Sequence, residues 1–176
     1  MTPPRYGPVE STSRATARRF WDKVLPEPAT GCWLWTGQVQ WNGYGSFWSD
    51  GRGVAAHRYS YEASVGPVPP RHDVDHVCRQ RSCVNPDHLR VATRGQNNAN
   101  SKSRDTASGM KGVWRFGGPR HPKGKPWRAG ITLDGKKTSL GVFATKHEAA
   151  IAYDEAAVRM FGEFALTNRR LGLLGD

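Results

Sequence analysis

The chain of 176 residues has no long hydrophobic run, and hydrophobic residues make up only 37% of it. Mean hydropathy is −0.66. No segment approaches the roughly 20 apolar residues that a bilayer span needs, which excludes a membrane-spanning protein. Residues 1–20 also lack the apolar core of a secretory signal, so we expect no signal peptide and a cytoplasmic protein.

Cysteine is scarce and odd in number, with one residue each at positions 32, 78 and 83. A single disulfide would leave one thiol over, whereas metal ligation fits a basic intracellular protein better. Cys78, Cys83 and His88 are spaced five residues apart, and Cys32 offers a fourth ligand from upstream. A Cys₃His set suits structural zinc and leaves no open position for substrate. Three buried thiols beside an unrelated histidine are the alternative.

Acidic residues are few, since 15 Asp and Glu stand against 26 Lys and Arg and give a net charge of +11. Such a charge predicts a polyanionic partner, nucleic acid before a membrane surface. A solvated basic protein of the ribosomal kind is the alternative. Residues 1–100 carry a net charge of +4 and residues 101–176 a net charge of +7. The polar segment 101–108 between them reads as a linker.

Patterning predicts an α+β protein of two small domains, residues 18–100 and 109–170, with a disordered tail at 1–17 and a short tail at 171–176. In the first domain we expect aromatic strands at 32–36 and 44–48 and a helix at 54–65. In the second we expect three antiparallel strands packed on one helix. These strands are residues 113–116, 127–133 and 138–143.

The helix of the second domain begins in a capping box, with Thr145 at the cap and Glu148 three residues later. It runs to about Phe161, and Gly162 ends it. Apolar residues at spacings of three and four predict one stripe that faces the sheet. The stripe consists of Ala149, Ala152, Tyr153, Ala156 and Met160.

His76 and Asn97 form a second set of chemically competent side chains. A neutral imidazole near pH 7 can take a proton from water, and His76 lies two residues before the proposed ligand Cys78. The carbonyl oxygen of Asn97 is a hard ligand of the kind that Mg²⁺ accepts. The alternatives are an ordinary core or surface histidine and an asparagine that caps a helix.

The run Asp75-His76-x-Cys78-x₄-Cys83-x-Asn85-Pro86-x-His88-Leu89, followed by Asn97, resembles the HNH nuclease motif in its zinc-bearing, His-Cys-box-like form. The resemblance implies the ββα-metal fold of homing endonucleases. The upstream segments 31–35, 43–45 and 57–58 are similar to HNH homing-type proteins as well. The resemblance therefore covers roughly residues 18–100.

The resemblance implies a role for each matched residue. His76 matches the general base, and Asn97 matches the ligand of a catalytic Mg²⁺, for which Mn²⁺ can substitute. Asp75 matches a position that binds metal in some relatives and not in others, and Arg58 either clamps the phosphate or faces solvent. A structural zinc is expected on Cys32, Cys78, Cys83 and His88. One metal at Asn97 would act as Lewis acid and leave a 3′-hydroxyl and a 5′-phosphate.

Residues 109–170 resemble the plant ethylene-response-factor (APETALA-type) DNA-binding domain, through segments such as Gly112-Val113-Trp114-Arg115, Trp127-Arg128-Ala129 and Leu140-Gly141. The resemblance implies a sheet that enters the major groove. Alternation independently places Ala129 and Ile131 on a core face and charged or polar residues on the other. The expected DNA contacts are Trp114, Arg115, Phe116, Arg128, Thr132, Lys137 and Ser139, with Arg128 reading guanine. A solvated basic face is the alternative.

Together these features predict a metal-dependent DNA endonuclease that is targeted by its second half. The joint architecture is similar to free-standing or intron-encoded homing nucleases of phages and bacteria, which act on double-stranded DNA in the bacterial or phage-infected cell. A monomer would nick one strand, and a symmetric homodimer could cut both. The alternatives are a DNA-binding regulator with a degenerate nuclease half and a zinc-stabilised RNA-binding protein.

Overall fold

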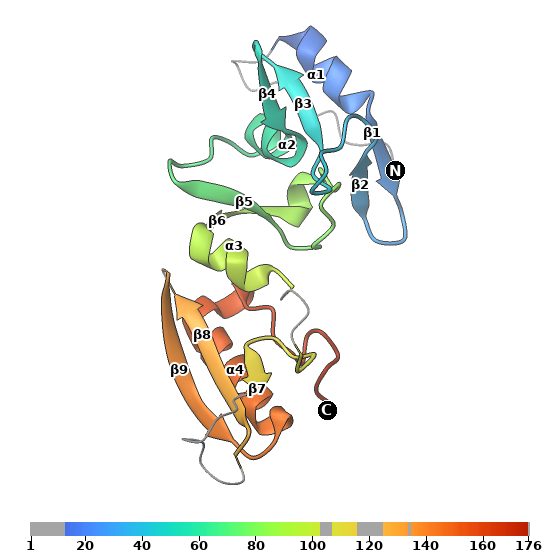
Figure 1. Cartoon of the computed structure of the whole chain (residues 1–176). Coiled ribbons are helices and arrows are strands. Elements are labelled where there is room, and N and C mark those ends of the chain that lie inside the picture. Colours follow the sequence, from blue (N-terminus) through green and yellow to red (C-terminus); the bar gives the residue numbers. More distant parts are fainter. Residues whose placement is uncertain (1–12, 103–106, 116–124, 134, 176) are drawn as a thin grey trace. The chain divides into compact units, whose positions relative to one another are not determined.

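The computed structural model describes residues 13–102, 107–115, 125–133 and 135–175 (Figure 1). Within them the chain is an α+β protein with small antiparallel sheets. Its contacts divide it into two compact units, Met1–Thr93 and Arg94–Asp176. This division precedes the segment 101–108 that the sequence predicts as a linker, and the helix Arg94–Asn100 is grouped with the second unit.

The first unit contains three two-stranded antiparallel sheets, in which β1 pairs with β2, β3 with β4 and β5 with β6. Each pair joins segments that are close in sequence, apart from β5 and β6, which enclose the cysteine-bearing loop. The elements are α1 (Arg14–Trp21), β1 (Val24–Glu27), β2 (Cys32–Trp35), β3 (Ser46–Ser49), β4 (Arg52–Ala55), α2 (Ala56–Ser64), β5 (His72–His76), η1 (Pro86–His88) and β6 (Leu89–Thr93).

An aromatic cluster forms the core of the first unit. The ring of Phe20 is fully buried and stacks on Trp35, with ring centroids 4.8 Å apart, and it contacts Tyr59 at 4.5 Å. Phe20 belongs to α1, which begins after Ser13 caps it by accepting a hydrogen bond from the amide of Thr16. The segment expected to be a disordered tail therefore becomes helical at Arg14, because Phe20 anchors this helix in the core.

The second unit is a three-stranded antiparallel sheet, in the order β7-β8-β9, with α4 packed against it. Thr145 caps α4 by accepting a hydrogen bond from the amide of Glu148, and Gly162 ends the helix, so the predicted start and stop are confirmed. The elements are α3 (Arg94–Asn100), β7 (Val113–Arg115), β8 (Trp127–Leu133), β9 (Lys136–Phe143), α4 (Lys146–Phe161) and η2 (Gly162–Phe164).

The buried stripe of α4 differs in part from the predicted one. Ala149, Tyr153 and Ala156 are buried as expected, whereas Met160 is 37% exposed and Ala152 is half-buried. The stripe instead continues from Tyr153 in steps of four residues, a spacing that keeps side chains on one face of a helix. Its remaining members are Ala150, Ala157 and Phe161. The assignment of Met160 to the core was therefore wrong.

The second unit reaches beyond the predicted domain at both ends. Lys111 is buried, and its ammonium donates hydrogen bonds to the carbonyls of Ala99 and, at 2.7 Å, of Ser101, at the end of α3. Asn168 is fully buried and joins the backbone of Lys111 to the carboxylate of Asp154. Near the C-terminus, Leu174 is buried in the core, although its segment was expected to be a tail.

Candidate metal centre and nuclease site

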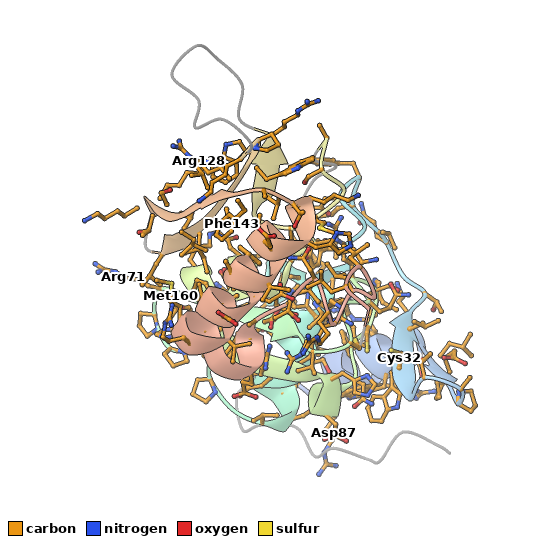
Figure 2. All side chains as sticks on the ribbon, turned by 90° about the horizontal axis from the view of Figure 1, so that it is seen from below. Cys32, Arg71, Asp87, Arg128, Phe143 and Met160 are labelled. Atoms are coloured by element: carbon orange, nitrogen blue, oxygen red, sulfur yellow. The ribbon has the colours of Figure 1, made fainter. Side chains whose placement is uncertain are left out.

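The structure brings together the four residues that the sequence proposes as zinc ligands. Cys32 begins β2, Cys78 and Cys83 lie in the loop after β5, and His88 ends η1. Their ligand atoms all lie within 4.8 Å of one another, and the three cysteines are free thiols. Figure 2 labels Cys32 on its strand.

The spacing within this cluster fits a tetrahedral ion. The Nδ1 atom of His88 lies 3.6 Å from the sulfur of Cys32 and 3.7 Å from the sulfur of Cys83. With Zn–S of about 2.3 Å and Zn–N of about 2.05 Å, a tetrahedral zinc separates these atoms by about 3.6 Å. The donor set and the geometry therefore both suit zinc, and four protein ligands would leave no position for a substrate.

Backbone pairing explains how distant residues reach one centre. The loop that holds Cys83 lies against β2, because the amide of Trp35 donates to the carbonyl of Ser82 at 2.8 Å and the amide of Val84 to the carbonyl of Trp33 at 2.7 Å. Asn85 ties the other side, since its side-chain amide donates to the carbonyl of Gly31 at 2.8 Å.

The cluster already favours a thiolate. Hydrogen bonding from the Cys83 thiol lowers the pKa of Cys78 to about 5 against the opposing effect of burial. The same hydrogen bond, together with burial, raises the pKa of Cys83. The amide of Asn85 also points at the sulfur of Cys83, at 3.4 Å. Because thiolates are the form that binds metal, these contacts prepare the loop for a cation.

His76 ends β5 and is held next to this cluster. Its Nε2 lies 2.9 Å from the carbonyl oxygen of Cys83, and a carbonyl only accepts, so Nε2 carries the proton. In the neutral ring Nδ1 is then the basic nitrogen. Burial lowers the pKa of His76, which keeps the ring neutral near pH 7. The side chain therefore has the protonation state that a general base requires.

Two aromatic rings, neither of which the sequence analysis singled out, surround His76. The ring centroid of His57 lies 4.6 Å from that of His76, and the centroid of Tyr44 lies 5.9 Å from it. Burial first, and then the charges of His76 and Arg58, lowers the pKa of His57 to about 3. Its Nδ1 has no hydrogen-bond partner among the described residues. The sequence signal for a functional role of His57 is its position in the segment 57–58, which resembles HNH proteins.

Asp75 and Arg58 are both held by other protein groups. Asp75 is 4% exposed, and its Oδ2 accepts a hydrogen bond at 3.1 Å from Nε of Arg90, its partner across β5 and β6. The Nε of Arg58 lies 2.9 Å from Glu62, and its Nη1 donates to the carbonyl of His72 at 3.3 Å. The spacing of four residues between Arg58 and Glu62 on one helix signalled this pair.

Asn97 lies on α3, which the contacts group with the second unit. Its side chain is half-buried. The strands β5 and β6 and the helix α3 follow one another along the chain in the order of a ββα motif. The packing of that motif, and the pairing of Asn97 with His76 in one catalytic site, stay predictions.

The sheet of the second unit has the two faces that alternation predicts near its centre. Ala129 and Ile131 are buried against α4. On the other face the ammonium of Lys137 lies 3.9 Å from the centroid of the Trp114 ring. A Cβ at Gly130 would lie 2.8 Å from that ring, so the glycine makes room for the indole.

The other residues proposed to contact DNA are placed as follows. Arg115, Thr132 and Ser139 are exposed, and Arg128 is half-buried on β8, where Figure 2 labels it. Phe116 lies outside the described residues. Leu133, at the end of β8, is 37% exposed, because α4 covers the middle of the strand and not its end.

Comparison with known proteins supports the nuclease resemblance. Residues 54–99 match the family model of an HNH endonuclease. Protein 7.7 of Escherichia phage T7 is 42% identical over 66 residues, which are 38% of this chain and 51% of that protein. Protein 2.8 of the same phage is 35% identical over 71 residues, 39% of this chain and 48% of that protein.

A protein named an uncharacterized HNH endonuclease, from Acanthamoeba polyphaga mimivirus, is 30% identical over 114 residues, 64% of this chain and 56% of that protein. The chain thus spans about half the length of these three relatives. No solved structure matches it. No helix in the described parts of the chain is both long enough and apolar enough to cross a membrane. The family match includes His76 and three of the four clustered side chains that could hold a metal ion, which supports a nuclease-type function for this segment.

Proposed function

We propose that this chain is a DNA endonuclease that hydrolyses phosphodiester bonds with His76 as general base. One observation carries the proposal. His76, in a segment that matches the HNH family, is fixed by its hydrogen bond to Cys83 in a loop that the Cys₃His cluster organises. Double-stranded DNA is the proposed substrate class, which is supported by the match of residues 54–99 to an HNH endonuclease family and by the net charge of +11.

In the proposed mechanism His76 accepts the proton of the attacking water at Nδ1, while Nε2–H stays on the carbonyl of Cys83. Cys32, Cys78, Cys83 and His88 would hold a structural zinc that fixes this loop. Asn97 would ligate a catalytic Mg²⁺ or Mn²⁺, which supplies Lewis-acid stabilisation of the leaving oxygen. In the ground state Asp75 is held by Arg90 and so orients β5 and β6 next to His76.

Targeting belongs to the second unit in this proposal. A sheet of three strands backed by one helix, with Trp114, Lys137 and Arg128 on its strands, is consistent with the ethylene-response-factor-like mode of entering the major groove. The phage relatives support a phage role, whereas a homing role is proposed from the resemblance alone. A genomic position inside an intron or beside a structural gene would support the homing role.

A second candidate is a DNA-binding regulator with an inactive nuclease segment. It is favoured by the burial of His76, which is 5% exposed, and by the engagement of Arg58 with Glu62. DNA cleavage separates the two functions, because a regulator needs only binding.

The deciding experiment measures nicking of a supercoiled plasmid with and without Mg²⁺. We expect the wild-type chain to nick only with the metal. His76→Ala should lower the rate by about 10²–10⁴, the usual contribution of a general base, and should leave DNA binding nearly intact. His76→Gln is the matched variant that keeps a side chain able to bond to Cys83. Equal nicking by wild type and both variants would contradict the assignment of the base.

A further inference from the structure

Among the described residues of the first unit, Trp41 is the most exposed large apolar side chain, at 98%. It lies in the loop of residues 37–45 between β2 and β3, which we name the Trp41 loop. Single exposed apolar residues are common on protein surfaces. The exposure of Trp41 indicates a binding contact only if the protein holds the indole in place.

The Trp41 loop is closely hydrogen-bonded. Two bonds of 2.8 Å close its tip, from the amide of Gln40 to the carbonyl of Tyr44 and from the amide of Gly43 to the carbonyl of Gln40. The indole nitrogen of Trp35 donates to the carbonyl of Gln38 at 3.1 Å and secures the base. These bonds present Trp41 on a fixed support.

Glycines at the base of the loop have a packing reason. A Cβ at Gly37 or at Gly45 would come within 2.5 Å of the buried indole of Trp35. Real Cβ atoms do not approach so closely, so the loop closes tightly over one tryptophan while it exposes another. The core thereby positions the Trp41 loop through Trp35.

Positive charge lies directly beside the loop. Arg81 is exposed in the loop that carries Cys78 and Cys83. The guanidinium of Arg81 donates to the carbonyl of Asn42 at 2.7 Å and lies 5.5 Å from the ring of Tyr44. An exposed aromatic ring beside an arginine is a combination that proteins use to stack on bases while they neutralise phosphates.

Tyr44 of the Trp41 loop lies close to His76, the proposed catalytic residue. The ring of Tyr44 lies 5.9 Å from that of His76. Trp41 is three residues from Tyr44 along the chain, so their Cα atoms are at most about 11 Å apart. The Trp41 loop therefore lies in the same part of the first unit as His76.

We propose that Trp41 inserts against the bases of double-stranded DNA near the phosphodiester bond that His76 attacks. The inference rests on the proposed nuclease function. It adds a DNA contact in the first unit, whereas the DNA contacts expected from the sequence lie mainly in the second. An aromatic wedge unstacks a base step and bends the duplex. The bend would bring the backbone toward the loop that carries His76.

The experiment compares Trp41→Ala, Trp41→Phe and Trp48→Ala in the full chain. Trp48 is the matched control, because it is 63% exposed on β3 of the same unit. Binding to a fluorescently labelled duplex is measured without Mg²⁺ at several salt concentrations, and plasmid nicking is measured with Mg²⁺. Circular dichroism verifies that each variant is folded.

We expect Trp41→Ala to bind the duplex about tenfold more weakly than wild type, because it removes one stacked ring. Trp41→Phe keeps an aromatic ring, so its affinity should stay within about threefold of wild type. The slope of the logarithm of affinity against that of salt concentration should not change, since indole carries no charge. Trp48→Ala should behave as wild type. Nicking by Trp41→Ala should fall at least as much as binding.

Wild-type DNA affinity in Trp41→Ala would overturn the proposal. That result is expected if Trp41 contacts a protein partner and not DNA. Equal losses in Trp41→Ala and Trp48→Ala would also overturn it, because the effect would then not belong to this loop. A chain that binds DNA but never nicks would refute the proposed nuclease function, while the binding measurements would still decide the role of Trp41.

Discussion

At the scale of single residues, the burial of His57 has a thermodynamic consequence. Its pKa in the folded chain is lowered to about 3, whereas an unfolded histidine titrates near about 6.5. Between these values the unfolded chain binds a proton that the folded chain excludes. The stability that depends on neutral His57 is thus fully present above about pH 6.5 and is lost as pH falls.

We therefore expect the free energy of unfolding to fall by about 1.4 kcal/mol for each pH unit below about 6.5 through this residue. Urea unfolding of zinc-saturated wild type and of His57→Phe, compared near pH 7 and near pH 5, measures it. Wild type should lose about 2 kcal/mol more than the variant over that range. Identical losses in the two proteins would show that His57 gains its proton in the folded state.

Gly112 has a φ of +71°, in the left-handed region that favours glycine. A Cβ at this position would overlap the ring of Tyr153 on α4. Gly112→Ala should destabilise the second unit by about 2–4 kcal/mol through overpacking and backbone strain. Gly109→Ala is the matched control, because Gly109 has φ +69° and open space around its Cα, so only the strain is added. Thermal unfolding that is equally lowered in both variants would contradict the role of Tyr153.

At the scale of elements, the four proposed zinc ligands join β2, the loop after β5 and η1. We expect one zinc per chain, and its removal by a chelator should unfold the first unit. An apparent binding free energy of about 10–16 kcal/mol is larger than the stability of a small domain. Cys78→Ser should give the same loss, measured by metal analysis and by limited proteolysis.

Ser82→Ala, in the same loop but outside the cluster, is the control and should retain zinc. Protease sensitivity should be confined to residues 13–93, since the second unit contains none of the ligands. A folded, active chain without zinc would refute this prediction, and so would a disulfide between two of the three cysteines.

At the scale of the whole molecule, the division of the chain changes which fragment should fold alone. Ala99 of α3 is buried with Tyr153 and Phe161 in the core of the second unit. Lys111 is bonded to the end of the same helix. We therefore expect residues 94–176 to fold and to bind duplex DNA, whereas residues 109–176 should be markedly less stable. Circular dichroism and fluorescence anisotropy of the two fragments measure this difference.

Affinity of the fragment 94–176 should fall steeply with salt, because each neutralised phosphate contributes a slope of about −0.9 on B-DNA. Arg128→Ala should relax sequence preference at one position at a cost of about 1–3 kcal/mol. A folded fragment with no affinity for DNA would show that recognition belongs to the first unit.

The candidate metal ligands and the local elements were predictable from the order of residues along the chain. Cys78, Cys83 and His88 are close along one loop, so their spacing already limits how far apart they can lie. The capping box at Thr145 and the alternation around Ala129 depend on neighbours in sequence, and the structure confirms both. Such features are visible in a sequence because short-range geometry is fixed by the backbone.

The contacts between groups distant in sequence became visible only in the folded chain. The tertiary structure placed Phe20 at the centre of the core, paired Asp75 with Arg90 across a sheet and packed the ring of His57 next to that of His76. It also grouped α3 with the second unit and turned Met160 outward. These outcomes depend on how whole elements fill space, because burial rewards total packing and no local pattern records which surfaces will meet.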